Sequence, residues 1–282
     1  MARHVTRMAL RQCALAISVL IDLDLELRHD GIEITGFPRV LVPWKECRVA
    51  LAGLAPETED GRQRLARWLL HRRWIADHTY DDLAERARPV GLPAGHALHP
   101  GTPWIRHSVP GGALDLGLGF RGIQPDHPDR VVVVPRGVFD AAGTDPMAFW
   151  KQARAYLEQM GSLAAERWRR DRSAIVRPMG DCDVVTLLGS HTFRWAVSAG
   201  EAQGMRAAVI PIRTRGWLDI SRIDPAFGPA AATATDEVDR GFARPVLVTA
   251  DEVMVVSAGG RPEAALQDPA AVRNWLRPLL YR

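Results

Sequence analysis

The chain has 282 residues, and its 47% hydrophobic and 24% charged residues exclude wholesale disorder because such a composition can bury a sizeable core. Its 36 basic and 33 acidic residues nearly balance, and the formal net charge of +3 is too small for the field that steers DNA. No apolar run reaches the ~20 residues that span a bilayer, and three widely spaced cysteines indicate a reducing compartment. We therefore expect a cytoplasmic protein with neither a membrane segment nor a disulfide framework.

Local patterns in the first part of the chain predict a hairpin followed by helices. The apolar run 14–21 is interpreted as a strand. Residues 21–28 and 32–35 alternate between apolar and polar residues around a turn at 29–31, which predicts a β-hairpin with one exposed face. Helical spacing and capping residues predict helices over 43–52, 60–77 and 79–87.

Residues 88–111 are rich in Pro, Gly and His and show no periodicity, which predicts a long irregular segment. We place a domain boundary there, between a hairpin-plus-helix region over 1–110 and a mixed region over 111–282. One continuous domain is the alternative. In the second region, apolar runs and caps predict strands at 113–120, 131–134, 174–176 and 207–212, helices after Asp145 and Ser190, an irregular segment over 221–245, a hairpin over 246–256 and a terminal helix from Asp268.

The alternation of short strands with helices in the middle of the chain predicts a partly parallel sheet. The hairpins near either end predict antiparallel additions to it. The fold class expected is therefore α/β mixed (α+β), with a mixed sheet, antiparallel hairpins at both ends and helices packed on it.

Several predicted strands end in Pro, Arg and Gly, and parallel strands would bring those ends to one edge, where α/β proteins bind ligands. Arginine grips phosphate or carboxylate with two hydrogen bonds, and a helix N-terminus favours anions. The alternative is that these residues only terminate strands. The predicted anion-binding residues are Arg136, Arg177, Ser190, Arg213 and Arg215.

Six of the nine histidines fall between residues 71 and 127. His96 and His99 have a spacing that metal sites use, and His107 lies nearby. These three histidines are the predicted ligands of zinc or a harder divalent ion, which could activate water. The alternative is that they are ordinary loop and surface histidines. No other cofactor is implied by a motif.

Trp217 follows two of the predicted anion-binding arginines. Because Trp and Arg dominate the hot spots of protein interfaces, Trp217 is a candidate contact with a protein partner. The alternative is that it belongs to the core.

No catalytic motif stands out: the chain lacks a GxSxG elbow, a P-loop and a complete dinucleotide fingerprint. Cys182 lies between Asp181 and Asp183, which would raise its thiol pKa, so we expect a structural cysteine. Residues 61–88 suit a helix-turn-helix only weakly, because the second helix is acidic and repels phosphate.

The favoured hypothesis is a non-catalytic interaction or regulatory protein with a protein partner. The alternatives are an enzyme acting on a small phosphate- or carboxylate-bearing substrate, with or without a metal, and a DNA-binding regulator.

Overall fold

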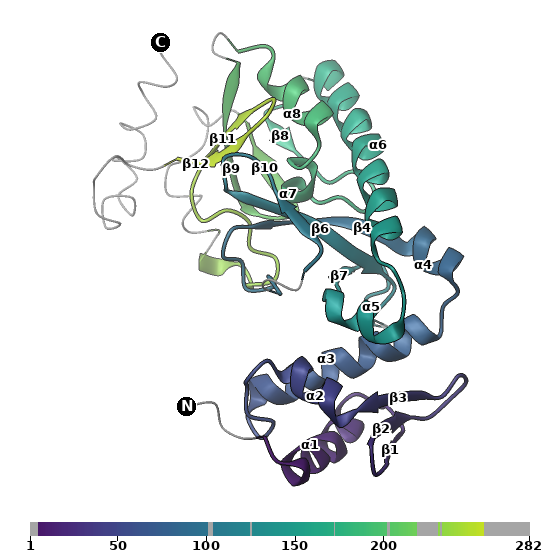
Figure 1. Ribbon diagram of the computed structural model, residues 1–282. Helices are drawn as coiled ribbons and strands as arrows, with labels where there is room; N and C mark the ends of the chain where they lie inside the picture. Colours follow the sequence, from purple (N-terminus) through teal and green to yellow (C-terminus); the bar gives the residue numbers. More distant parts are fainter. Residues whose placement is uncertain are drawn as a thin grey trace. The chain divides into compact units, whose positions relative to one another are not determined.

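The structure is a computed structural model that describes residues 5–100, 104–124, 126–171, 173–201, 204–218, 231 and 233–256. The chain forms two compact units, each of which gathers segments that are distant in sequence (Figure 1). Unit 1 takes its residues from 1–86, 122–128 and 134–146, and unit 2 takes its residues from 87–121, 129–133 and 147–282. The boundary predicted at residue 110 lies inside unit 2.

Unit 1 combines a small antiparallel sheet with helices. Its elements are α1 (Arg7–Leu20), β1 (Leu25–Leu27), β2 (Gly31–Ile34), β3 (Val40–Pro43), α2 (Trp44–Leu51), α3 (Glu59–Ala76), α4 (Tyr80–Arg86) and α5 (Arg136–Ala142). The strands follow the order β1-β2-β3, and β1 pairs with β2 as the predicted hairpin. The three predicted helices are confirmed as α2, α3 and α4, whereas β3 was not predicted.

The strand predicted over 14–21 is wrong, because this segment is the second half of α1. The helix begins at Thr6, whose hydroxyl oxygen accepts a hydrogen bond from the Ala9 amide. Its buried positions are Leu10, Cys13, Ala14 and Ile17, which recur at helical spacing. The helical period is visible only in a window that includes Leu10.

Unit 2 contains two antiparallel sheets and the longest helix. Its elements are β4 (Ala87–Pro93), β5 (Arg106–Ser108), β6 (Leu114–Arg121), β7 (Val131–Val133), α6 (Met147–Asp171), β8 (Ile175–Val176), α7 (Val184–Leu187), α8 (His191–Ser198), β9 (Met205–Ile212), β10 (Arg215–Trp217), β11 (Val246–Thr249) and β12 (Val253–Val255). One sheet has the order β4-β6-β5 with β7 also on β6, and the other has the order β12-β11-β9-β10-β8. The terminal helix predicted from Asp268 and most of the irregular segment 221–245 lie outside the described residues.

The α+β class is confirmed, and so is the second hairpin, which β11 and β12 form. Every strand pairing among the described residues is antiparallel, so the partly parallel sheet is not found there. The strands expected to end at one edge lie in different sheets, because β7 joins β6 while β8 and β9 belong to the five-stranded sheet. None of the described helices has both the length and the apolar character needed to cross a bilayer.

Strand β4 occupies the start of the segment that was predicted to be irregular. Pro89 and Pro93 are unusual in strands, so the sequence pattern does not predict β4. Both are tolerated because β4 is an edge strand and needs fewer amide donors to the neighbouring strand. Position 91 requires glycine because a Cβ there would lie 2.7 Å from the Thr186 Cα, which is too close for a side chain. The Gly91 amide donates to the Thr186 hydroxyl at 2.8 Å, which ties β4 to α7.

Helices α6 and α8 contact each other closely around Gly161, which does not interrupt α6. A Cβ on Gly161 would overlap the Ser190 side chain. Ser190 caps α8 and donates its hydroxyl hydrogen to Glu158 at 2.8 Å. The Glu158 carboxylate also accepts the His191 amide at 3.3 Å, so a side chain of α6 completes the N-terminus of α8.

We predict that Gly161→Ala destabilises the protein by about 1–3 kcal/mol, because the added methyl group forces α6 away from Ser190. Urea denaturation followed by circular dichroism measures the effect. Gly200→Ala is the control, since no atom lies near its Cβ position and its backbone is not left-handed. A similar change in the two variants would contradict the close packing described.

His71 on α3 is buried, with 5% of its surface exposed. Its Nδ1 atom is also buried and has no hydrogen-bond partner among the described residues. Burial, with a smaller contribution from Arg67, lowers the pKa of His71 to about 4. The histidine is therefore neutral in the folded protein at pH 7.

We predict that unit 1 loses stability when the pH falls from 6.5 towards 4. In this range the unfolded His71 binds a proton and the folded one does not, so protonation favours unfolding. At pH 4.5 the loss attributable to His71 is about 2 kcal/mol. Urea denaturation at pH 7 and 4.5 measures the change in the free energy of unfolding for the wild type and for His71→Leu. The variant should lose correspondingly less stability on acidification, because it has no histidine to protonate. Equal losses would show that other groups dominate.

Candidate functional site

The three histidines of the predicted metal site make separate contacts in unit 2. The His96 Nδ1 accepts the Leu98 amide at 3.1 Å, so its Nε2 carries the hydrogen and donates to the Arg240 carbonyl at 3.0 Å. Burial and the nearby Arg213 lower the pKa of His96, which favours this neutral form. A metal would have to displace one of these hydrogen bonds.

His99 lies instead against the carboxylate of Asp115, a buried residue of β6. Its Nε2 is 3.1 Å from Asp115 Oδ2, and Arg106 donates to Oδ1 at 2.6 Å. The Ser108 hydroxyl donates to the same oxygen, so this carboxylate is fully engaged. His107 is on β5, with its ring centroid 6.0 Å from that of Trp150. No group of three or more His, Cys, Asp or Glu side chains in the described segments is arranged to hold a metal ion, and the metal site stays a prediction.

Three of the five predicted anion-binding residues have internal partners. Arg213 forms an ion pair with Asp183, with 2.7 Å from its Nε and 2.6 Å from its Nη2 to the same oxygen, and both side chains are mostly buried. Ser190 caps α8 and bonds to Glu158. Arg136 belongs to unit 1 and lies 3.6 Å from Asp140 on α5. Arg213 and Ser190 thus serve contacts inside the fold, whereas Arg136 forms an exposed pair on the surface of α5.

Arg177 and Arg215 are different, because both are exposed. Strands β8 and β10 pair antiparallel, with Val176 opposite Gly216 and Ile175 opposite Trp217. Continuing this register by one residue places Arg177 directly opposite Arg215. Neither guanidinium forms an ion pair with another residue in the described ranges. Two like charges at opposed positions repel each other, and a bound anion would relieve that repulsion.

The face that carries this pair is the one turned away from the core. A Cβ on Gly216 would meet Ile210 and Val184, so Gly216 faces the core and its neighbours on β10 face outward. The outward side chains of Ile175, Arg177, Arg215 and Trp217 form what we call the β8–β10 face. Ile175 is 38% exposed and Trp217 is partly exposed. The structure thus brings together two predicted anion-binding residues and the predicted partner contact.

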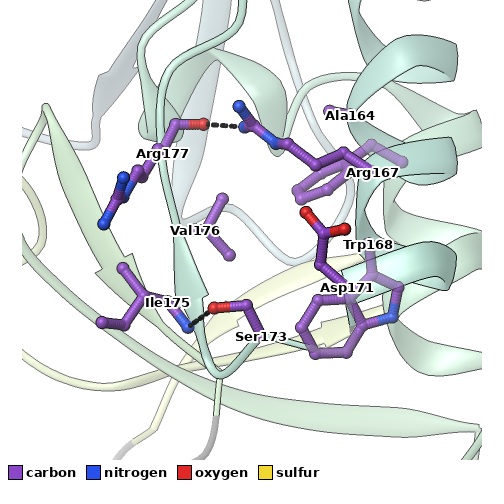
Figure 2. Close-up of a pocket in the computed structure, with 9 residues that line it drawn as sticks. Ala164, Arg167, Trp168, Asp171, Ser173, Ile175, Val176 and Arg177 are labelled. Atoms are coloured by element: carbon purple, nitrogen blue, oxygen red, sulfur yellow. Dashed lines mark hydrogen bonds between the residues drawn. The ribbon is translucent and has the colours of Figure 1, made fainter.

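A pocket of about 370 Å³ lies between β8 and the end of α6. It is lined by Ala164, Arg167, Trp168, Asp171, Ser173, Ile175, Val176, Arg177 and Phe193. Figure 2 shows Val176 and Asp171 pointing into the space, while the side chains of Ile175 and Arg177 extend on the opposite side of the strand. Ile175 and Arg177 therefore border both the pocket and the β8–β10 face.

Hydrogen bonds fix the polar edge of this pocket. Arg167 donates to the Arg177 carbonyl at 2.6 Å (Figure 2) and to the Pro178 carbonyl at 3.3 Å. The Ser173 hydroxyl oxygen accepts the Ile175 amide at 3.1 Å. The Arg167 contacts hold the end of α6 against the segment that follows β8.

Sequence reasoning missed Arg167, Trp168 and Asp171, which lie in the last two turns of α6. Arg167 and Asp171 are one helical turn apart, a spacing shared by many surface pairs. Nothing local separates them from the other charges on this helix. Only the position of β8 shows that they border a pocket.

The cysteines offer no activated nucleophile. Burial raises the pKa of the Cys182 thiol, with further increases from Asp183 and Asp181, as predicted. Burial also raises the pKa of Cys47 to about 12 and that of Cys13 to about 11. All three thiols are therefore protonated at pH 7.

No family model, curated protein or solved structure matches this chain.

We predict that Arg213→Ala lowers stability by about 3 kcal/mol, because it leaves the largely buried Asp183 carboxylate without its cation. Arg215→Ala should change stability by less than about 0.5 kcal/mol, since the side chain is exposed. Thermal and urea denaturation of the two variants compare a structural arginine with a candidate binding one. Comparable losses would place Arg215 among the structural residues.

Proposed function

We propose that this protein is a non-catalytic binding protein that recognises an acidic, amphipathic segment of a partner protein through the β8–β10 face. The observation that carries this proposal is the register of β8 and β10, which, continued one residue past Val176, sets the exposed Arg177 across from the exposed Arg215. No carboxylate in the described ranges forms an ion pair with either arginine, so the two are suited to a carboxylate supplied from outside.

The apolar residues beside the arginines determine the kind of partner. Trp217 and Ile175 are directly opposed on the two strands and occupy the positions next to the arginine pair. The outward side chains of the neighbouring strands include Val209 and Leu247, both partly exposed. A partner segment with apolar side chains on one face and carboxylates along its edge would match both parts of this surface.

The carboxylates of unit 2 support binding over catalysis, because the well-placed ones already accept internal hydrogen bonds. Asp115 accepts three side-chain donors, Asp183 accepts Arg213, and Glu158 accepts the capping contacts of α8. Asp181 accepts Arg88 at 2.6 Å. A general base needs an unoccupied oxygen near its substrate, and these groups are committed to the fold.

The experiment measures binding of two fluorescent amphipathic helical peptides, one Leu/Glu and one Leu/Lys, by anisotropy at low salt. We expect the acidic peptide to bind and the basic one not to bind. Replacing Arg177 and Arg215 together by alanine should weaken binding of the acidic peptide at least about tenfold, or about 1.4 kcal/mol. Affinity should also fall as salt is added.

Arg136→Ala is the matched control, because it removes an exposed arginine from the other unit. Equal binding of both peptides, or unchanged binding by the double variant, would overturn the proposal. If inorganic phosphate stabilises the wild type and not the double variant while neither peptide binds, the arginine pair holds a small anion instead of a protein partner.

A further inference from the structure

The geometry points to a second binding site: the pocket between α6 and β8 takes a small zwitterion of the α-amino acid type with an apolar side chain. This inference does not rest on the proposed function, because the groups that would hold the ligand are Arg167 and Asp171 of α6, although Ile175 and Arg177 border both the pocket and the β8–β10 face (Figure 2). Three features of the pocket carry it: its apolar wall, its paired charges and its size.

The apolar wall consists of buried side chains from three elements. Trp168 and Ala164 come from α6, Phe193 from α8 and Val176 from β8. Arg206 lies over the Trp168 ring at 5.0 Å from its centroid, which helps to hold the indole in place. This wall would bury an apolar side chain of a ligand, with a gain that grows with the area covered.

The charged edge carries Arg167 and the carboxylate of Asp171, which is partly exposed and also forms an ion pair with Arg170 at 2.8 Å through one oxygen. Arg167 is held by the two backbone carbonyls that it contacts, and no carboxylate in the described part of the chain lies at hydrogen-bond distance from its guanidinium. Asp171 points into the pocket one helical turn further along α6 (Figure 2). A hydrogen bond from Arg170 lowers the pKa of Asp171, so the carboxylate is ionised at pH 7.

This pair of charges discriminates between ligand classes. A simple anion attracted by Arg167 would be repelled by Asp171, and a simple cation would meet the reverse. A zwitterion can place its carboxylate near Arg167 and its ammonium near Asp171. The Ser173 oxygen accepts the Ile175 amide, which leaves the hydroxyl hydrogen able to donate to the ligand carboxylate.

The size of the pocket limits the ligand. Its volume of about 370 Å³ lies near the lower end of the roughly 300–1,000 Å³ typical of ligand pockets. A single amino acid with a large apolar side chain suits this space better than a nucleotide or a folded peptide. The ammonium and the carboxylate of such a molecule are also close enough together to meet charges on one helix end.

Isothermal titration calorimetry of the full chain with three matched probes tests the inference. L-Phenylalanine carries both charges, 3-phenylpropionate lacks the ammonium, and phenethylamine lacks the carboxylate. We expect L-phenylalanine to bind at least about tenfold more tightly than either, which corresponds to about 1.4 kcal/mol. Asp171→Asn should remove the advantage of L-phenylalanine over 3-phenylpropionate.

Glu166→Gln is the control, because it neutralises an exposed carboxylate on the same helix that does not line the pocket. Similar affinities for all three probes, no binding of any probe, or an unchanged preference in Asp171→Asn would each overturn the inference. Arg215→Ala should leave amino acid binding unchanged, so failure of this site and failure of the β8–β10 face are distinguishable.

Discussion

The crossing of α6 and α8 is the constraint on which the rest of unit 2 depends. Glu158 supplies the acceptor that the first residues of α8 require, and Gly161 lets the two helices approach closely enough for that contact. With this crossing fixed, the end of α6 lies beside β8 and Phe193 of α8 reaches the pocket wall. The same packing covers the core face of the five-stranded sheet and leaves the β8–β10 face outward.

The arginines of this chain divide according to their surroundings. Arg194 is buried and donates to the Leu188 carbonyl at 2.7 Å and the Ala250 carbonyl at 3.0 Å, which ties the β11–β12 turn to α8. Arg213 neutralises Asp183. A buried guanidinium needs such partners, because desolvation of an unpaired charge is costly. Arg177 and Arg215 are exposed, so water solvates their guanidinium groups and they need no internal partner. Their charges are therefore available for recognition.

Sequence patterns predicted the α+β class, both hairpins and most helices, because periodicity and caps act over a few residues. They failed where a longer window or a tertiary partner decides the structure. Helix α1 required Leu10 to reveal its period, and β4 exists despite two prolines because β6 pairs along its whole length. The candidate site was accessible only in part: Arg177, Arg215 and Trp217 were singled out, but the parallel sheet edge that was expected to gather the arginines is not found among the described residues. The antiparallel register that opposes the arginines joins segments about forty residues apart, which no local pattern reveals.

Strand β8 has only two residues and ends its sheet, so its outward amide and carbonyl groups would ordinarily invite a strand from another molecule. Ser173 already accepts the Ile175 amide, and Arg167 already donates to the Arg177 carbonyl. Intermolecular strand addition would have to break both hydrogen bonds. The side chains at the edge of the pocket thus also protect this sheet against aggregation through its open end.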